Sequence, residues 1–180
     1  FQRIGVILGV IWTLILGTSL ALDVVNMRNY TLQAARVAAR AQFRKDVIYR
    51  AWSASHGGLY APVTEATPPN PYLEQVEERD IETPSGVKLT LINPAYMTRQ
   101  AHELGRKTLG VEGHITSLNP IRPANKPDGW ETKALELFEL GEKEYSSVEK
   151  IENRKYLRLM QPLITEESCL KCHAEQGYKV

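Results

Sequence analysis

Two cysteines followed by a histidine, near the carboxyl end, are the residues best suited to chemistry. They stand in the segment Cys169-Leu170-Lys171-Cys172-His173, which has the form C-x-x-C-H. Two thiols at this spacing can bond to the two vinyl groups of a porphyrin while the adjoining imidazole reaches the iron. The motif therefore predicts one covalent haem c, attached through Cys169 and Cys172 and ligated by His173.

Three other uses of the cysteine pair are open: a structural disulfide, a dithiol redox centre, or half of a zinc site. The sequence contains only these two cysteines, so no second pair can complete a zinc site. The surrounding residues also lack the βαβ pattern in which a redox C-x-x-C normally lies. Both observations favour haem over the alternatives.

The sixth ligand of the iron is a separate question, because histidine, methionine or a vacancy would each set a different redox potential. We expect His56 to fill it, since Gly57 and Gly58 beside it allow the backbone to approach a porphyrin closely. Each candidate also has an ordinary structural role in capping, core packing or hydrogen bonding. The other candidates are Met97, His102 and His114.

The composition argues against other functional classes. The formal net charge is +1 and acidic and basic residues are interspersed, so nucleic acid is not an expected partner. The sequence shows no recognisable Ser-His-Asp constellation, phosphate loop or paired-carboxylate cleft, and we expect no enzyme activity. Arg99, Arg122 and Lys126 could pair with haem propionates, although solvated surface charge is the commoner role of such residues.

The first residues predict a membrane anchor. Ile4 to Leu22 contain no charged residue, and as a helix they would extend about 29 Å, close to the thickness of a bilayer core. No small-residue cleavage site follows, which favours an anchor over a signal peptide. Arg3 and Asp23 flank the run, and the positive-inside rule favours a cytoplasmic amino terminus. We expect residues 1–23 to cross the bacterial inner membrane once and leave the haem domain in the periplasm, where c-type haem is attached.

A stalk helix is expected over residues 24–57, because no proline or glycine occurs between Asp23 and His56. Its length of about 48 Å exceeds what a small domain can bury, so its first half should pair with another helix. For the second half, packing on the chain's own domain and homodimerisation are equally open. The apolar stripe consists of Leu32, Ala35, Ala39, Phe43, Val47 and Ala51.

Residues 58–180 are expected to form an α+β domain. Residues 60–71 contain four prolines and predict an extended connector or a loop that covers a ligand. A turn at residues 84–86 precedes a strand over Val87–Ile92, and Asn93-Pro94 begins a helix that should end near Leu104.

The second half of this domain shows a further helix and a hairpin. Asp128 is a suitable cap for a helix over about residues 129–140. Strands are expected over Tyr145–Ile151 and Arg154–Gln161, joined by a two-residue turn at Glu152-Asn153. The sequence thus predicts a small antiparallel sheet with two or three short helices.

The whole pattern resembles membrane-anchored, haem-c-binding sensor domains with a PAS-like fold, found in bacterial histidine kinases and chemoreceptors. The resemblance implies that Cys169 and Cys172 attach the haem and that His173 is its proximal ligand. The distal ligand of such domains comes from the long helix or just after it, which favours His56; some relatives use a cysteine, and this helix has none. The matching stretches are YRAWSASHGGLYAPVT, NPYL, LTLINPAYMTRQ, GHITSLNPIRPANKPDGWE, LRLMQPL and TEESCLKCHAEQGY.

The resemblance implies a periplasmic sensor of redox state or of a diatomic gas, which dimerises through its stalk. An electron-transfer cytochrome subunit of a membrane complex would share every site residue, and a membrane-anchored interaction module without haem is a third possibility. Sensor domains of this kind continue past the haem motif into a glycine-rich strand and a transmitter. A natural end at Val180 would instead favour electron transfer. Of these three functions we expect the sensor function.

Overall fold

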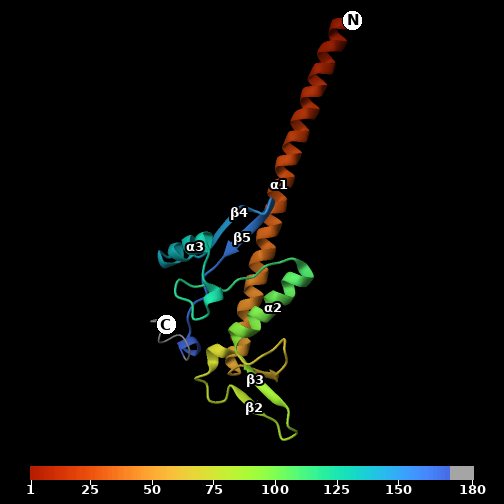
Figure 1. Ribbon diagram of the computed structural model, residues 1–180. Coiled ribbons are helices and arrows are strands. Elements are labelled where there is room, and N and C mark those ends of the chain that lie inside the picture. Colours follow the sequence, from red (N-terminus) through yellow and green to blue (C-terminus); the bar gives the residue numbers. More distant parts are fainter. Residues whose placement is uncertain (171–180) are drawn as a thin grey trace. The chain divides into compact units, whose positions relative to one another are not determined.

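The computed structural model describes residues 1–170 of the chain (Figure 1). The chain divides into two compact units, residues 1–41 with 147–159, and residues 42–146 with the chain from Met160 onward. The described part is mixed α and β with small antiparallel sheets, as the predicted α+β class requires. The helices and strands are α1 (Gln2–Ser55), β1 (Leu59–Pro62), β2 (Asp80–Glu82), β3 (Lys88–Ile92), α2 (Pro94–Leu109), α3 (Gly129–Glu139), β4 (Tyr145–Ile151) and β5 (Arg154–Met160).

Helix α1 is a single element of 54 residues that contains both the expected anchor and the expected stalk. Every side chain from Ile4 to Leu22 is exposed, and an 18-residue window has a mean hydropathy of 2.2. By length and composition it is the one helix within residues 1–170 that could cross a membrane. The helix ends at Ser55, and the left-handed angles of Gly57 (φ 75°) and Gly58 (φ 104°) confirm the predicted stop.

The inner face of α1 follows the predicted apolar stripe only over its first half. Phe43 is half-buried as expected, but Val47 and Ala51 are exposed. Beyond Phe43 the covered positions are Asp46, Arg50, Ala54 and the fully buried Ser53. A straight helix has 3.6 residues per turn, so a fixed step of four drifts around the axis and leaves the buried side. The prediction for Val47 and Ala51 was therefore wrong, and mostly polar residues face the domain there.

A three-stranded antiparallel sheet has the order β1-β3-β2. Its central strand β3 was predicted, and it buries Thr90 and Ile92. Residues 60–62 of β1 were expected to be part of a connector; Tyr60 pairs with Leu91 instead, so this part of the prediction was wrong. Strand β2 had no sequence signal because it is short, exposed and acidic at both ends, and only its pairing with β3 makes it a strand.

Helix α2 begins where the sequence predicts. The Asn93 side chain accepts a hydrogen bond from the backbone N–H of Tyr96 at 2.9 Å, and Pro94 occupies the first turn. The helix does not end near Leu104 but continues through Gly105 to Leu109. A glycine inside a helix costs only about 1 kcal/mol relative to alanine, which the surrounding helix tolerates. Gly110, with φ of 65°, forms the left-handed cap.

Helix α3 and the hairpin after it follow local signals. Asp128 and Glu131 form a reciprocal capping box at the start of α3, which confirms the predicted cap. Strands β4 and β5 pair around Glu152 (φ 45°) and Asn153 (φ 69°). Positive φ at both turn residues identifies a type I′ turn, the form that suits the twist of a hairpin.

The core of the described residues is small and lies in the second unit. Its buried apolar side chains are Leu73, Ile92, Tyr96 and Ala134. Several polar residues are buried with them, among them Asn70, Thr98 and Glu131. Buried polar groups require hydrogen-bond partners, so this core depends on specific polar contacts as well as on apolar packing.

Candidate functional site

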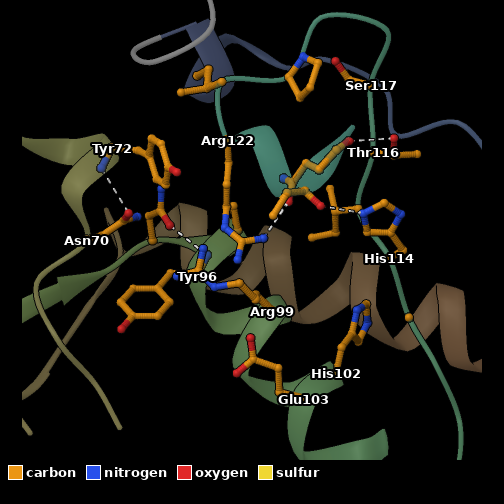
Figure 2. A pocket seen from close by; sticks show the side chains of 18 of the residues that line it. Asn70, Tyr72, Tyr96, Arg99, His102, Glu103, His114, Thr116, Ser117 and Arg122 are labelled. Carbon is orange, nitrogen blue, oxygen red and sulfur yellow. Dashed lines mark hydrogen bonds between the residues drawn. The ribbon is translucent and has the colours of Figure 1, made fainter. Parts of the chain in front are cut away.

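A cavity of about 400 Å³ lies within the second unit (Figure 2). Its walls come from the end of α1, the turn at residues 70–73, helix α2 and the connection over residues 113–125. The volume falls in the range of roughly 300–1,000 Å³ that small-molecule and cofactor sites occupy. Four segments far apart in the sequence therefore enclose one candidate site.

Positive charge dominates the lining of this cavity. Among the described residues that line it, the only carboxylate is that of Glu103, against the four guanidinium groups of Arg50, Arg99, Arg106 and Arg122. Within residues 1–170, none of the four arginines forms an ion pair with a carboxylate. Arg99 stacks on the Tyr96 ring at 4.4 Å instead. The cavity is therefore suited to a ligand that brings negative charge.

The first cysteine of the C-x-x-C-H motif is among the groups that influence an arginine of this cavity electrostatically. Burial lowers the pKa of the Arg50 guanidinium, and Cys169 and Asp46 oppose this only in part. Cys169 is half-buried, and its Sγ accepts a hydrogen bond from the Glu166 N–H at 3.4 Å. Cys172 and His173 lie outside the described residues, so their predicted roles stay predictions.

His102 is a cavity residue whose ring is held from two sides. Its Nε2 lies 2.8 Å from Asp46 Oδ2, and both side chains are more than four-fifths buried, at 17% and 18% exposure. Gly113 covers the ring so closely that a Cβ there would lie 2.4 Å from Nδ1. An imidazole oriented by a carboxylate is a common arrangement in metal proteins. The contact also ties α1 to α2 and to the connection after it.

We expect Gly113→Ala to destabilise the fold by about 1–3 kcal/mol, because the new methyl group must displace the His102 ring and disturb its bond to Asp46. Chemical unfolding monitored by circular dichroism measures the effect. Gly129→Ala is the matched control, since a Cβ at Gly129 would meet nothing within 4 Å. Equal stabilities of the two variants would contradict the predicted clash.

His114 has both ring nitrogens engaged. Its Nδ1 lies 2.8 Å from Glu131 Oε1 and its Nε2 lies 3.2 Å from the Ala124 carbonyl oxygen. The hydrogen bond to Glu131 raises the pKa of His114, and burial opposes this only in part. Burial raises the pKa of Glu131, but hydrogen bonds from His114 and from the Asp128 N–H outweigh it and leave that pKa lowered. The pair therefore links the connection over residues 113–125 to the capping box of α3.

This pair predicts a pH dependence of stability. The stabilisation from His114, whose pKa is raised, is complete below its unfolded value of 6.5 and is lost as the pH rises through the folded value. Glu131 has a lowered pKa, so its stabilisation is complete above its unfolded pKa of 4.5. It is lost as the pH falls through the pKa of the folded state. The pair thus contributes most between pH 4.5 and 6.5.

Glu131→Gln should therefore reduce the decline in unfolding free energy as the pH rises above 6.5. Chemical unfolding at a series of pH values measures this slope. Glu136→Gln removes an exposed carboxylate from the same helix and should leave the slope unchanged. A Glu131→Gln slope identical to that of the wild type would show that the pair does not cause the dependence.

The other residues singled out in the sequence divide into two groups. His56 is exposed and does not line the cavity; its Nδ1 lies 2.8 Å from the Trp52 carbonyl oxygen, and its ring packs on Trp52. Met97 is half-buried on α2 and also lies outside the lining. The proposed role of His56 as sixth ligand is not tested by these positions. The predicted residues that do line the cavity are His102, His114, Arg99 and Arg122; Lys126 does not.

Arg50 and Asp46 were not singled out in the sequence. Arg50 lines the cavity, and Asp46, one helical turn before it on α1, lies outside the lining but contacts His102. Opposite charges at this spacing often form a surface pair, which is a sufficient explanation without a structure. No sequence signal distinguished them from the other charges of the stalk.

Comparison with known proteins gives one match. No curated protein and no solved structure matches the chain. Residues 18–179 match the family model described as Tll0287-like. This match supports the cytochrome part of the resemblance noted in the sequence, whereas a PAS-like fold and a sensor function stay predictions. Because the match extends over most of the sequence, the chain belongs to the Tll0287-like family, a cytochrome c-type family of cyanobacteria.

Proposed function

We propose that the chain is a membrane-anchored monohaem c-type cytochrome domain that acts as a redox or gas sensor on the periplasmic side of the membrane. Cys169 and Cys172 attach the haem and His173 ligates its iron. Bound haem supplies reversible one-electron chemistry and a metal that can take a diatomic ligand. The observation that carries the proposal is the cationic cavity in a chain whose sequence contains the C-x-x-C-H motif.

The cavity lining suits a haem in three respects. Leu73, Ile115 and Ile121 offer apolar surface for a porphyrin face. Imidazole groups are present within the same walls, and arginines offer partners for the two carboxylates of a haem. Among the described residues no group of three or more metal-ligating side chains competes for a different metal. The donor set therefore fits haem.

A sensor function is supported by the continuity of α1. The same helix contains the segment that could cross a membrane and, near its end, Arg50 on the cavity wall. A change of charge or ligation in the cavity would act on Arg50 and hence on a helix that reaches the membrane segment. Pairing of two copies through α1, or assembly into a membrane complex, is part of this proposal.

The haem is tested by the intact mass and the pyridine haemochrome spectrum of protein matured in a host that attaches c-type haem. We expect the added mass of one haem and a c-type spectrum. Cysteine sulfurs joined in a disulfide, or bound to zinc, would contradict the proposal.

The sensor function is tested on the same preparation. A sensor should bind CO or NO with a spectral shift, or change its α1 pairing with haem redox state. A protein that does neither, but is oxidised rapidly by a membrane partner, would be an electron-transfer subunit.

A further inference from the structure

We propose that Arg50, Arg99 and Arg122 form a carboxylate-binding cluster that takes the two propionates of the haem inside the cavity. This inference rests on the proposed function, because it assumes that haem is attached at Cys169. It adds that the carboxylates are buried against arginines and do not point into solvent. The three arginines come from α1, α2 and the connection between α2 and α3.

The three guanidinium groups lack the partners that they would normally have. Arg50 donates only to neutral acceptors, the Pro94 carbonyl oxygen and Thr98 Oγ1, both at 3.5 Å. Arg122 donates to Asn125 Oδ1 at 3.1 Å. Arg99 lies over an aromatic ring. Within residues 1–170 no carboxylate pairs with any of them, and Figure 2 shows Arg99 and Arg122 directed into the cavity.

Arg50 needs a counter-charge most. It lies between α1 and α2, where burial lowers the pKa of its guanidinium. The charge of Asp46 offsets this effect only in part, and Asp46 is already paired with His102, so a further anion beside Arg50 would be favourable. The sequence alone presents Arg50 as one of many charges on a stalk helix. The tertiary contacts to Pro94 and Thr98 show that it belongs to the cavity.

Carboxylates are the anions that fit this arrangement best. The planar guanidinium presents two parallel N–H donors that match the two oxygens of a carboxylate. A haem held in this cavity would bring two such carboxylates to the three guanidinium groups. A diffusible carboxylate such as citrate would satisfy the same groups, so the experiment must separate the two sources.

The test is the midpoint potential of the haem-loaded protein in detergent, measured by spectroelectrochemistry. Arg50→Gln should lower the equilibrium constant for reduction about tenfold, which corresponds to about 59 mV for a one-electron couple. The reason is that loss of a nearby positive charge disfavours the added electron. Arg50→Lys retains the charge and should restore most of the potential. Arg99→Gln and Arg122→Gln should shift it in the same direction.

Arg44→Gln is the matched control, because Arg44 is exposed on the same helix and does not line the cavity. Wild-type potentials in haem-loaded Arg50→Gln, Arg99→Gln and Arg122→Gln would overturn the cluster. If Arg50→Gln fails to load haem, the midpoint potentials of Arg99→Gln and Arg122→Gln decide whether the cluster exists. A wild-type potential that depends on added citrate at constant ionic strength would also overturn it, since the arginines would then bind a diffusible anion. Absence of haem from the wild type would instead refute the proposed function.

Discussion

A Cys169→Ala, Cys172→Ala double variant is expected to contain no covalently bound haem. Each thioether bond to a porphyrin requires a cysteine sulfur, and the sequence has no other cysteine to replace these two. The intact mass should fall by one haem beyond the mass of the two substitutions, and the c-type haemochrome spectrum should disappear. This is the largest effect that we expect, because the loss of covalently bound haem should be complete.

Lys171→Ala is a suitable control for this experiment. Lys171 lies between the two cysteines in the sequence, in the variable part of the motif, and its loss leaves the attachment groups intact. Its haem content should equal that of the wild type. A double variant that retains the haem mass and spectrum would mean that the haem is attached elsewhere or that the motif has another use.

The second large effect is expected from Tyr96→Ala. Tyr96 is only 3% exposed, its hydroxyl donates to the Pro68 carbonyl oxygen at 2.8 Å, and Arg99 lies over its ring. Removal of a buried aromatic side chain leaves a cavity that costs about 3–5 kcal/mol. Because Tyr96 also lines the candidate cavity, any haem loading there should fall with stability. Chemical unfolding and haem content, measured on one preparation, check both effects.

Two further variants separate packing from hydrogen bonding. Tyr96→Phe keeps the ring and loses the hydroxyl, so it should cost only about 1–3 kcal/mol from the carbonyl left without its partner. Tyr156→Ala removes a tyrosine that is 40% exposed and should cost less than Tyr96→Ala. If all three variants were equally stable, Tyr96 would not be a core residue of the cavity wall.

Several elements of this protein follow from local rules and were therefore predictable. A helix cap needs only an acceptor side chain at the right residue, as Asn93 and Asp128 provide. The absence of proline and glycine predicted the long run of α1, and Gly57 marked its end. The C-x-x-C-H motif is local in the same sense, because its attachment chemistry depends on residues within five positions.

Features that depend on distant residues were missed or misplaced. Strand β2 exists because β3 pairs with it, and two of its three residues are acidic and have low strand propensity. The end of α2 was placed too early because glycine is a weak helix breaker, whose cost the rest of the helix can offset. A pattern of three- and four-residue steps also could not show where the inner face of α1 changes from apolar residues to Asp46 and Arg50.

The sequence by itself determined which residues can attach and ligate a haem and which segment can cross a membrane, because both properties reside in short runs of neighbouring residues. Only the tertiary structure decided which residues surround the candidate cavity. It brings Asp46 to His102 across 56 positions and Arg50 to Thr98 across 48. Contacts over such separations depend on how helices pack. The spacing of residues along one helix does not show which distant residues that helix will contact.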